Sequence, residues 1–167
     1  MMRSESRIDS TDARLLLALA GRPRATVIAL AEQAGLSRNT VQARLARLER
    51  RGVLDSIERQ IPPALLGYPL TAFITVQVTQ RRLDAVAEAL ASVPEVLQVH
   101  GISGQVDLLV HVVAADADDL YRIAGQVLAI PGVERSSTAL VMRELVSYRI
   151  TPLLRQCARE PGRPSRA

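Results

Sequence analysis

Apolar residues recur at every third or fourth position through the first fifty residues, which is the period of amphipathic helices. The pattern predicts three short helices, over residues 9–20, 26–34 and 37–52. Each begins at or beside a residue whose side chain can cap a helix, namely Asp9, Thr26 and Ser37. Gly35 lies in a turn of about three residues between the second and third helices, and this spacing is that of a helix-turn-helix.

After residue 52 the pattern changes from helical to extended. Residues 53–61 look extended, with their polar side chains outward. Residues 62–69 contain three prolines and one glycine, a composition typical of a linker and not of a regular element. A domain boundary is therefore expected at residues 62–69.

The second half of the chain contains an internal repeat of strand and helix patterns. The strands are predicted over residues 72–78, 95–103, 107–113 and 132–142, and the helices over residues 82–94 and 116–131. The two copies are offset by 37 residues, the distance from Pro94 to Pro131. Two fused β-α-β units predict a ferredoxin-like βαββαβ sandwich, in which both helices cover one face of a four-stranded antiparallel sheet.

The predicted fold class is therefore α+β, with a helix-turn-helix domain at residues 1–61, a linker at 62–69 and a ferredoxin-like domain at 70–150. The strands, such as FITVQV at 73–78, are apolar on both sides, so the open face of the sheet needs a partner. We expect a homodimer through this domain. Residues 151–167, which end in a stretch rich in Arg, Pro and Gly, are expected to form a flexible tail.

Charge separates the two halves of the chain. The net charge of +4 lies within residues 1–60, which hold 11 arginines and 7 acids, whereas residues 61–167 hold 10 of each. A localised excess of positive charge favours a polyanionic partner. Cys157 is the only cysteine, so an intramolecular disulfide is excluded.

Residues 36–54, LSRNTVQARLARLERRGVL, contain five arginines and one acid, Glu49. On a helical projection Val41, Leu45 and Leu48 share one apolar face. Amide and small side chains face away from it, where they could read base edges in a DNA major groove, while flanking arginines could reach phosphates. The predicted DNA contacts are Ser37, Arg38, Asn39, Thr40, Gln42, Ala43, Arg44 and Arg47. The alternative is a solvated helix of a bundle, which the helix-turn-helix spacing and the charge asymmetry disfavour.

The sequence resembles the Lrp/AsnC, or feast/famine, family of bacterial transcription regulators. The resemblance lies in LSRNTVQARLARLERRGVL and the residues before it, and in VPEVLQVHGISGQVDLLVHVV and IPGVERSSTALVM downstream, and it covers roughly residues 8–148. It implies an N-terminal winged helix-turn-helix joined to a ferredoxin-like sensor domain. It also implies dimers that assemble into octamers, with amino acids as common effectors.

In that family the effector lies between dimers, near the turn that joins the second and third strands of the sensor domain. By this resemblance the effector-binding candidates are His100, Gly101, Ser103, Gly104, Asp107, Glu134, Ser136 and Thr138. Backbone N–H groups of the turn could hold a carboxylate, and Asp107 could meet an ammonium group. The alternative is that Gly104 and Asp107 are turn residues only. Val106 stands where the family often has an aromatic residue.

Other chemistry finds no support in the residue pattern. No metal-ligand spacing, phosphate-binding glycine loop or nucleophile elbow occurs, so we expect neither a cofactor nor an enzyme. No apolar run resembles a signal peptide or approaches the roughly 20 residues of a membrane span, so a cytoplasmic, nucleoid-associated protein is expected.

The prediction is a sequence-specific DNA-binding regulator controlled by a small effector. Two alternatives stay open: an architectural DNA-binding protein, and an amino-acid-binding module that regulates an enzyme.

Overall fold

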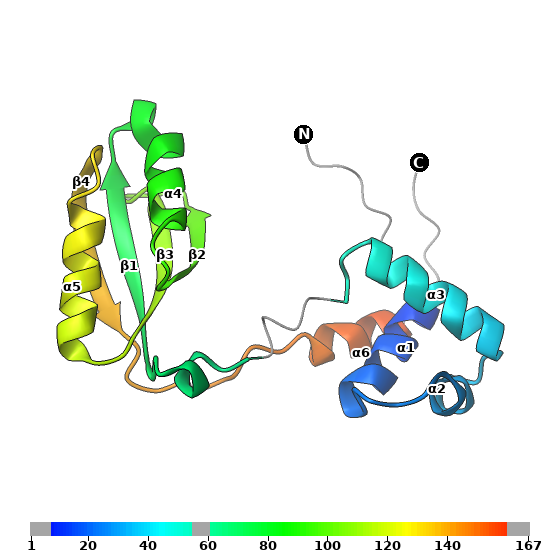
Figure 1. Cartoon of the computed structure of the whole chain (residues 1–167). Helices are drawn as coiled ribbons and strands as arrows, with labels where there is room; N and C mark the ends of the chain where they lie inside the picture. The colour runs from blue at the N-terminus through cyan, green and yellow to red at the C-terminus, as the bar shows by residue number, and fades with distance from the viewer. Residues whose placement is uncertain (1–7, 55–60, 160–167) are drawn as a thin grey trace. The chain divides into compact units, whose positions relative to one another are not determined.

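The computed structural model describes residues 8–54 and 61–159. They form two compact units (Figure 1). The first, called here the helical unit, contains the N-terminal helices together with the chain from Val146 onward. The second, the sheet unit, contains the four strands and the two helices between them.

The helical unit contains the three expected helices, α1 (Ser10–Gly21), α2 (Val27–Ala34) and α3 (Arg38–Arg50). Their caps are those predicted from the sequence. The Asp9 carboxylate accepts the Asp12 N–H at 2.7 Å, and Ser37 Oγ accepts the Thr40 N–H at 3.1 Å. Gly35 ends α2 with a φ of 65°, a left-handed conformation that glycine adopts without steric cost.

A fourth helix completes the helical unit. Residues 151–167 were expected to be flexible, but Thr151–Arg159 form α6, which packs against α1 (Figure 1). That expectation is wrong for these residues, and residues 160–167 lie outside the described part of the chain. Leu154 on α6 is buried in one apolar cluster with Leu15, Leu30 and Val41. The core of the helical unit thus joins both ends of the chain.

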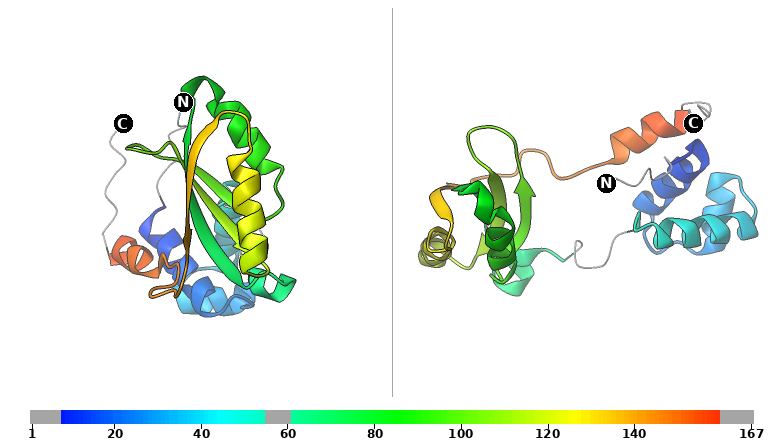
Figure 2. Two further views of the ribbon diagram at one scale, coloured as in Figure 1. Left: turned by 90° about the vertical axis from the view of Figure 1, so that its left-hand side faces the viewer. Right: turned by 90° about the horizontal axis from the view of Figure 1, so that it is seen from above.

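The sheet unit has the predicted βαββαβ order. Its elements are β1 (Leu70–Val78), α4 (Leu83–Ala91), β2 (Val96–Gly101), β3 (Leu108–Ala114), α5 (Ala117–Leu128) and β4 (Val133–Leu140). The strand order is β2-β3-β1-β4, and every neighbouring pair is antiparallel. Both helices cover the same face of the sheet (Figure 2). The ferredoxin-like prediction is confirmed.

The alternation of side chains along the strands explains this layering. Ile74 and Val110 point to the helix-covered face and are fully buried. Phe73 and His111 point to the open face, where their rings stack with centroids 4.9 Å apart. Side chains on successive residues lie on opposite faces of a strand, so each strand contributes alternate residues to the helix-covered face and to the open face.

Two connecting segments differ from the expectation. The linker predicted at 62–69 contains a short 3-10 helix, η2 (Pro63–Leu66), because proline fits the first position of a helical turn. A second one, η3 (Gln80–Arg82), precedes α4. The extended segment predicted at 53–61 falls mostly on residues 55–60, which lie outside the described residues.

Candidate nucleic-acid interface and sensor turn

One face of α3 is buried and the other is exposed, as the helical projection predicts. Val41 and Leu48 are fully buried, and Leu45 is partly buried against them. The exposed side chains on the remaining surface are those of Arg38, Asn39, Gln42, Ala43, Glu49 and Arg50. Amide and small side chains therefore stand where α3 could approach another molecule.

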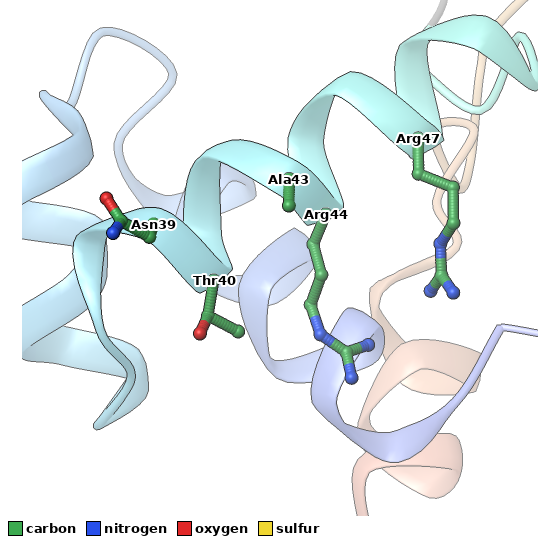
Figure 3. A pocket seen from close by; sticks show the side chains of 5 residues that line it. All are labelled: Asn39, Thr40, Ala43, Arg44 and Arg47. Atoms are coloured by element: carbon green, nitrogen blue, oxygen red, sulfur yellow. The ribbon is translucent and has the colours of Figure 1, made fainter.

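The first turn of α3 is held by hydroxyl groups. Ser37 Oγ lies 2.8 Å from Thr40 Oγ1 and also accepts the Thr40 N–H. These two predicted contact residues therefore stabilise the start of α3. Beside them lies a shallow hollow lined by Asn39, Thr40, Ala43, Arg44 and Arg47 (Figure 3).

Arg44 and Arg47 do not extend freely from the flank of α3. Arg44 Nη1 lies 2.7 Å from Asp9 Oδ2 and 2.7 Å from Asp12 Oδ1, and Arg47 Nη2 donates to Asp12 Oδ2. In Figure 3 both side chains reach toward α1. The sequence predicts that these two arginines contact DNA phosphates, whereas in this structure their guanidinium groups are paired with carboxylates. They instead fasten α3 to α1.

The burial of the partners is unequal. The Asp12 side chain is 0% exposed, whereas those of Arg44 and Arg47 are 26% and 44% exposed. A buried carboxylate is stable only when it is paired and hydrogen-bonded, so Asp12 depends on both guanidinium groups. Burial alone would raise the pKa of Asp9, but hydrogen bonds from the Arg44 side chain and the Asp12 N–H hold it below its usual value. Hydrogen bonds to Asp9 and Asp12 raise the pKa of Arg44.

A signal for this network was present in the sequence. Asp9 and Asp12 are three residues apart at the start of one helix, and Arg44 and Arg47 are three residues apart on another. Residues at this spacing share one helical face, so two acidic side chains can meet two basic ones. A helical projection of α3 alone does not show the pairing, because both acidic partners belong to the start of α1.

The turn between β2 and β3, residues 100–107 and called here the sensor turn, is anchored to the end of β1 by Asp107. Its carboxylate accepts the Val78 N–H at 2.8 Å and the Gln80 side-chain N–H at 2.7 Å. Its backbone N–H donates to the Val76 carbonyl at 3.0 Å. Gly104 has a φ of 130°, a conformation that favours glycine. His100, Gly101, Ser103 and Gly104 are exposed.

The candidates on β4 are not gathered around the sensor turn within one chain. Ser136 pairs with Val76 and Thr138 with Ile74, so both lie on the helix-covered face at one edge of the sheet. His100 pairs with Leu109 on the open face at the other edge, three strand spacings or about 14 Å away.

Glu134 lies closer to the sensor turn than the other β4 candidates. Its carboxylate accepts the Thr79 hydroxyl at 2.9 Å, one residue from the anchors of Asp107. The structure therefore associates Glu134 with Asp107 through the end of β1.

Residues 8–54 and 61–159 contain neither a metal-binding cluster nor a membrane-spanning helix. No cluster of three His, Cys, Asp or Glu side chains there could hold a metal ion. Within the same ranges, no helix has the length and apolar character needed to cross a membrane.

Comparison with protein families supports both units. Residues 8–55 match a family described as winged helix-turn-helix DNA-binding, and residues 71–151 match one described as Lrp/AsnC ligand binding domain. The first match covers α1 to α3, and the second covers the sheet unit from the second residue of β1 to the end of β4.

Individual relatives agree with these matches. The HTH-type transcriptional regulator AldR of Mycolicibacterium smegmatis is 32% identical over 142 residues, which cover 83% of this chain and 83% of the relative. The proline dehydrogenase transcriptional activator of Rhodobacter capsulatus is 31% identical over 143 residues, covering 83% and 93%. A solved feast or famine regulatory protein from M. tuberculosis, complexed with L-methionine, is 29% identical with a TM-score of 0.74, covering 86% of this chain and 97% of that one.

Proposed function

The chain belongs to the Lrp/AsnC family of transcriptional regulators, and we propose that it binds operator DNA through α3 under the control of an amino-acid effector. The observation that carries the DNA contact is the exposed face of α3, where Asn39, Gln42 and Ala43 stand clear of the core. Asn and Gln can each form two hydrogen bonds with adenine, and Ala can meet the thymine methyl group.

The basic residues of α3 have two different roles in this proposal. Arg38 and Arg50 are exposed on α3 and supply the phosphate contacts. Ser37 and Thr40 support the N-terminus of α3, whose partial positive charge also favours a phosphate. Arg44 and Arg47 position α3 through Asp9 and Asp12.

A dimer would present two copies of α3 to successive major-groove faces, about 34–36 Å apart, on an imperfectly palindromic site. The partly exposed open face of the sheet, with Phe73 and His111 on it, is the surface proposed to join the two chains. Assembly of dimers into octamers belongs to the same proposal. We place the linker between the DNA-binding and sensor domains at residues 62–69.

The effector site is proposed at the sensor turn. Backbone N–H groups of Gly101, Ser103 and Gly104 would hold the carboxylate of an amino acid, with His100 beside them. Asp107 already accepts two hydrogen bonds, but a carboxylate has about four acceptor positions and can still receive an ammonium group. Ser136 and Thr138 would join this site from a second dimer, whereas Glu134 would join it from the same chain, beside the residues that anchor Asp107.

The solved feast or famine regulatory protein from M. tuberculosis is complexed with L-methionine, and this similarity supports an amino-acid ligand for the present chain. Because its partner is proposed to be chromosomal DNA, we place the protein in the cytoplasm, associated with the nucleoid. A regulatory role without enzymatic activity or cofactor completes the proposal.

The test is fluorescence anisotropy of the full chain with its own upstream promoter DNA and with random DNA, over a range of salt concentrations. A sequence-specific regulator binds the promoter about a thousandfold or more tightly than random DNA at physiological salt. Equal affinity for both would favour an architectural protein. No affinity for either would leave the amino-acid-binding module that regulates an enzyme.

Matched variants separate the proposed roles on α3. Gln42→Ala should reduce the discrimination between promoter and random DNA by roughly 1–3 kcal/mol. Arg38→Ala should weaken binding to both alike and lower the salt slope by about one. If Arg44→Ala lowers the salt slope just as Arg38→Ala does, Arg44 contacts phosphate in the complex after all.

The effector is tested by thermal unfolding of the full chain with each proteinogenic amino acid, beginning with L-methionine. A ligand that raises the unfolding temperature is then added to the promoter-binding assay. Stabilisation together with a changed DNA affinity supports the effector role. If no amino acid changes either quantity, an amino-acid effector is excluded.

A further inference from the structure

The C-terminal helix α6 lies beyond the part of the chain that resembles the family's ligand-binding domain. That match ends at residue 151, where α6 begins. The chain leaves the helical unit after α3, forms the sheet unit and then returns to the helical unit. The sheet unit is therefore attached to the helical unit at both of its ends.

One face of α6 is apolar and contributes to the core of the helical unit. Leu154, Cys157 and Ala158 are spaced at i, i+3 and i+4 and all belong to the apolar cluster around α1. Leu154 is 8% exposed, whereas its neighbour Leu153 is 65% exposed. The Cys157 thiol donates to the Ile8 carbonyl at 3.3 Å. The position of α6 is thus specific and not that of a loose end.

The contact of Cys157 lies directly beside the network that holds α3. Ile8 precedes Asp9, which caps α1 and binds Arg44 of α3. The first turn of α1, which Asp9 caps, supplies Asp12, the buried partner of Arg44 and Arg47. A continuous path of packed side chains and hydrogen bonds therefore runs from α6 through the start of α1 to α3.

We propose that α6 is a positioning element for the DNA-recognition helix, fixing the start of α1 and thereby the carboxylates that hold Arg44 and Arg47. This rests on the proposed function, because it presumes that α3 reads DNA. Since β4 leads into α6 through residues 141–150, the sheet unit is covalently linked to α6 as well as, through the linker at 62–69, to α3. A change in the sheet unit could therefore reach α3 a second way, through the non-covalent contacts of α6 with α1.

The first experiment compares two neighbouring leucines of α6 in the full chain. Leu154→Asp places a charge in the core and should release α6, whereas Leu153→Asp changes an exposed position and serves as the matched control. We expect Leu154→Asp to weaken promoter binding about tenfold or more and Leu153→Asp to leave it within about twofold. Leu154→Met, which restores an apolar side chain of similar volume, should rescue binding.

The second experiment uses Cys157, the only thiol in the chain, as a reporter of α6 docking. The uncharged reagent N-ethylmaleimide should label Leu154→Asp at least about tenfold faster than the parent or Leu153→Asp, since a docked thiol is half-buried. If the docked state of α6 binds DNA tenfold more tightly than the undocked state, DNA must favour docking by the same factor. Saturating promoter DNA should therefore slow the labelling of Cys157 in the parent about tenfold. Labelling through global unfolding of the helical unit would instead slow further with every increase in DNA concentration, without levelling off at this factor.

The outcomes separate this inference from the function on which it rests. A parent protein without DNA affinity overturns both. A parent that binds DNA, with Leu154→Asp binding equally well despite faster labelling, overturns the positioning role alone. Equal labelling rates for Leu154→Asp and Leu153→Asp would show that α6 does not dock as inferred. If DNA protects Cys157 in Leu154→Asp as strongly as in the parent, DNA shields the thiol directly and the coupling is refuted.

Discussion

The two units of this protein are stabilised by different interactions. The buried core of the sheet unit is built entirely from aliphatic residues such as Ile74, Val110 and Val127. The helical unit has a smaller apolar cluster and adds the pairing of Asp9 and Asp12 with Arg44 and Arg47. Among the described residues, Asp12 is the single charged side chain that is fully buried.

The difference changes how the charge of the helical unit is interpreted. Five arginines lie between residues 36 and 54, but two of them are neutralised by acids of α1. In the sheet unit, Arg122 pairs with Glu95 and Asp119 at the surface, where an ion pair contributes little. The same type of interaction is therefore structural in one unit and peripheral in the other. Net charge alone overstates what is available to bind DNA.

The strongest test of this difference between the two units is to remove the buried carboxylate of Asp12. Asp12→Asn should destabilise the helical unit by about 3 kcal/mol, because it replaces the charge-assisted hydrogen bonds of a buried carboxylate to Arg44 and Arg47 with weaker ones. Thermal unfolding by circular dichroism, with hydrogen exchange to locate the change, measures the effect. Glu32→Gln, an exposed carboxylate change on α2, is the control. Equal unfolding temperatures for the two variants would refute a structural role for the network.

The corresponding change in the sheet unit is the loss of a buried aliphatic side chain. Ile74→Ala should cost about 3 kcal/mol, through lost burial and the cavity that remains. Hydrogen exchange should rise in β1 and β3 but not in α3. Leu128→Ala, at an exposed apolar position on α5, should have little effect. Faster exchange in α3 on Ile74→Ala would show that the two units unfold together.

Acid should affect the helical unit through Asp9. Its pKa in the folded protein is held below the usual value of about 3.9, so the unfolded chain binds the proton more readily. The stability contributed by Asp9 is present above that value and is lost as the pH falls from it through the lower pKa of the folded protein. Asp9→Asn keeps the cap but should reduce the loss of stability between about pH 5 and pH 3. Thermal unfolding across this range is the measurement, and Asp116→Asn at the cap of α5 is the control.

The smallest expected effect concerns His111 in the sheet unit. Burial lowers the pKa of His111, and the neighbouring His100 lowers it further. The unfolded chain therefore takes up a proton at about pH 6.5, before the folded protein does, and stability declines as the pH falls below that value. His111→Gln should reduce the slope of unfolding temperature against pH between about 7 and 5.5. An unchanged slope would mean that other groups dominate there.

Local patterns predicted most of the fold. The caps at Asp9, Thr26 and Ser37 were identified because capping needs only a polar side chain before a helix. The βαββαβ order followed from the 37-residue repeat. Helix α6 was not predicted, because the Arg, Pro and Gly residues at the end of the chain indicated a flexible tail. The apolar face of α6, formed by Leu154, Cys157 and Ala158, becomes evident only when it is packed against α1.

For the candidate sites, the sequence by itself determined which residue types occupy the exposed face of α3 and the sensor turn. Helical and strand periods decide which side of an element a residue occupies, and these periods are local. Only the tertiary structure decided which of those residues are already engaged. It paired Arg44 and Arg47 with carboxylates more than thirty residues away, tied Asp107 to the end of β1, and separated His100 from Thr138 across the sheet. Such pairings depend on how whole elements pack. A charged or polar side chain that packing buries must form a hydrogen bond or an ion pair, because burying it without one costs free energy.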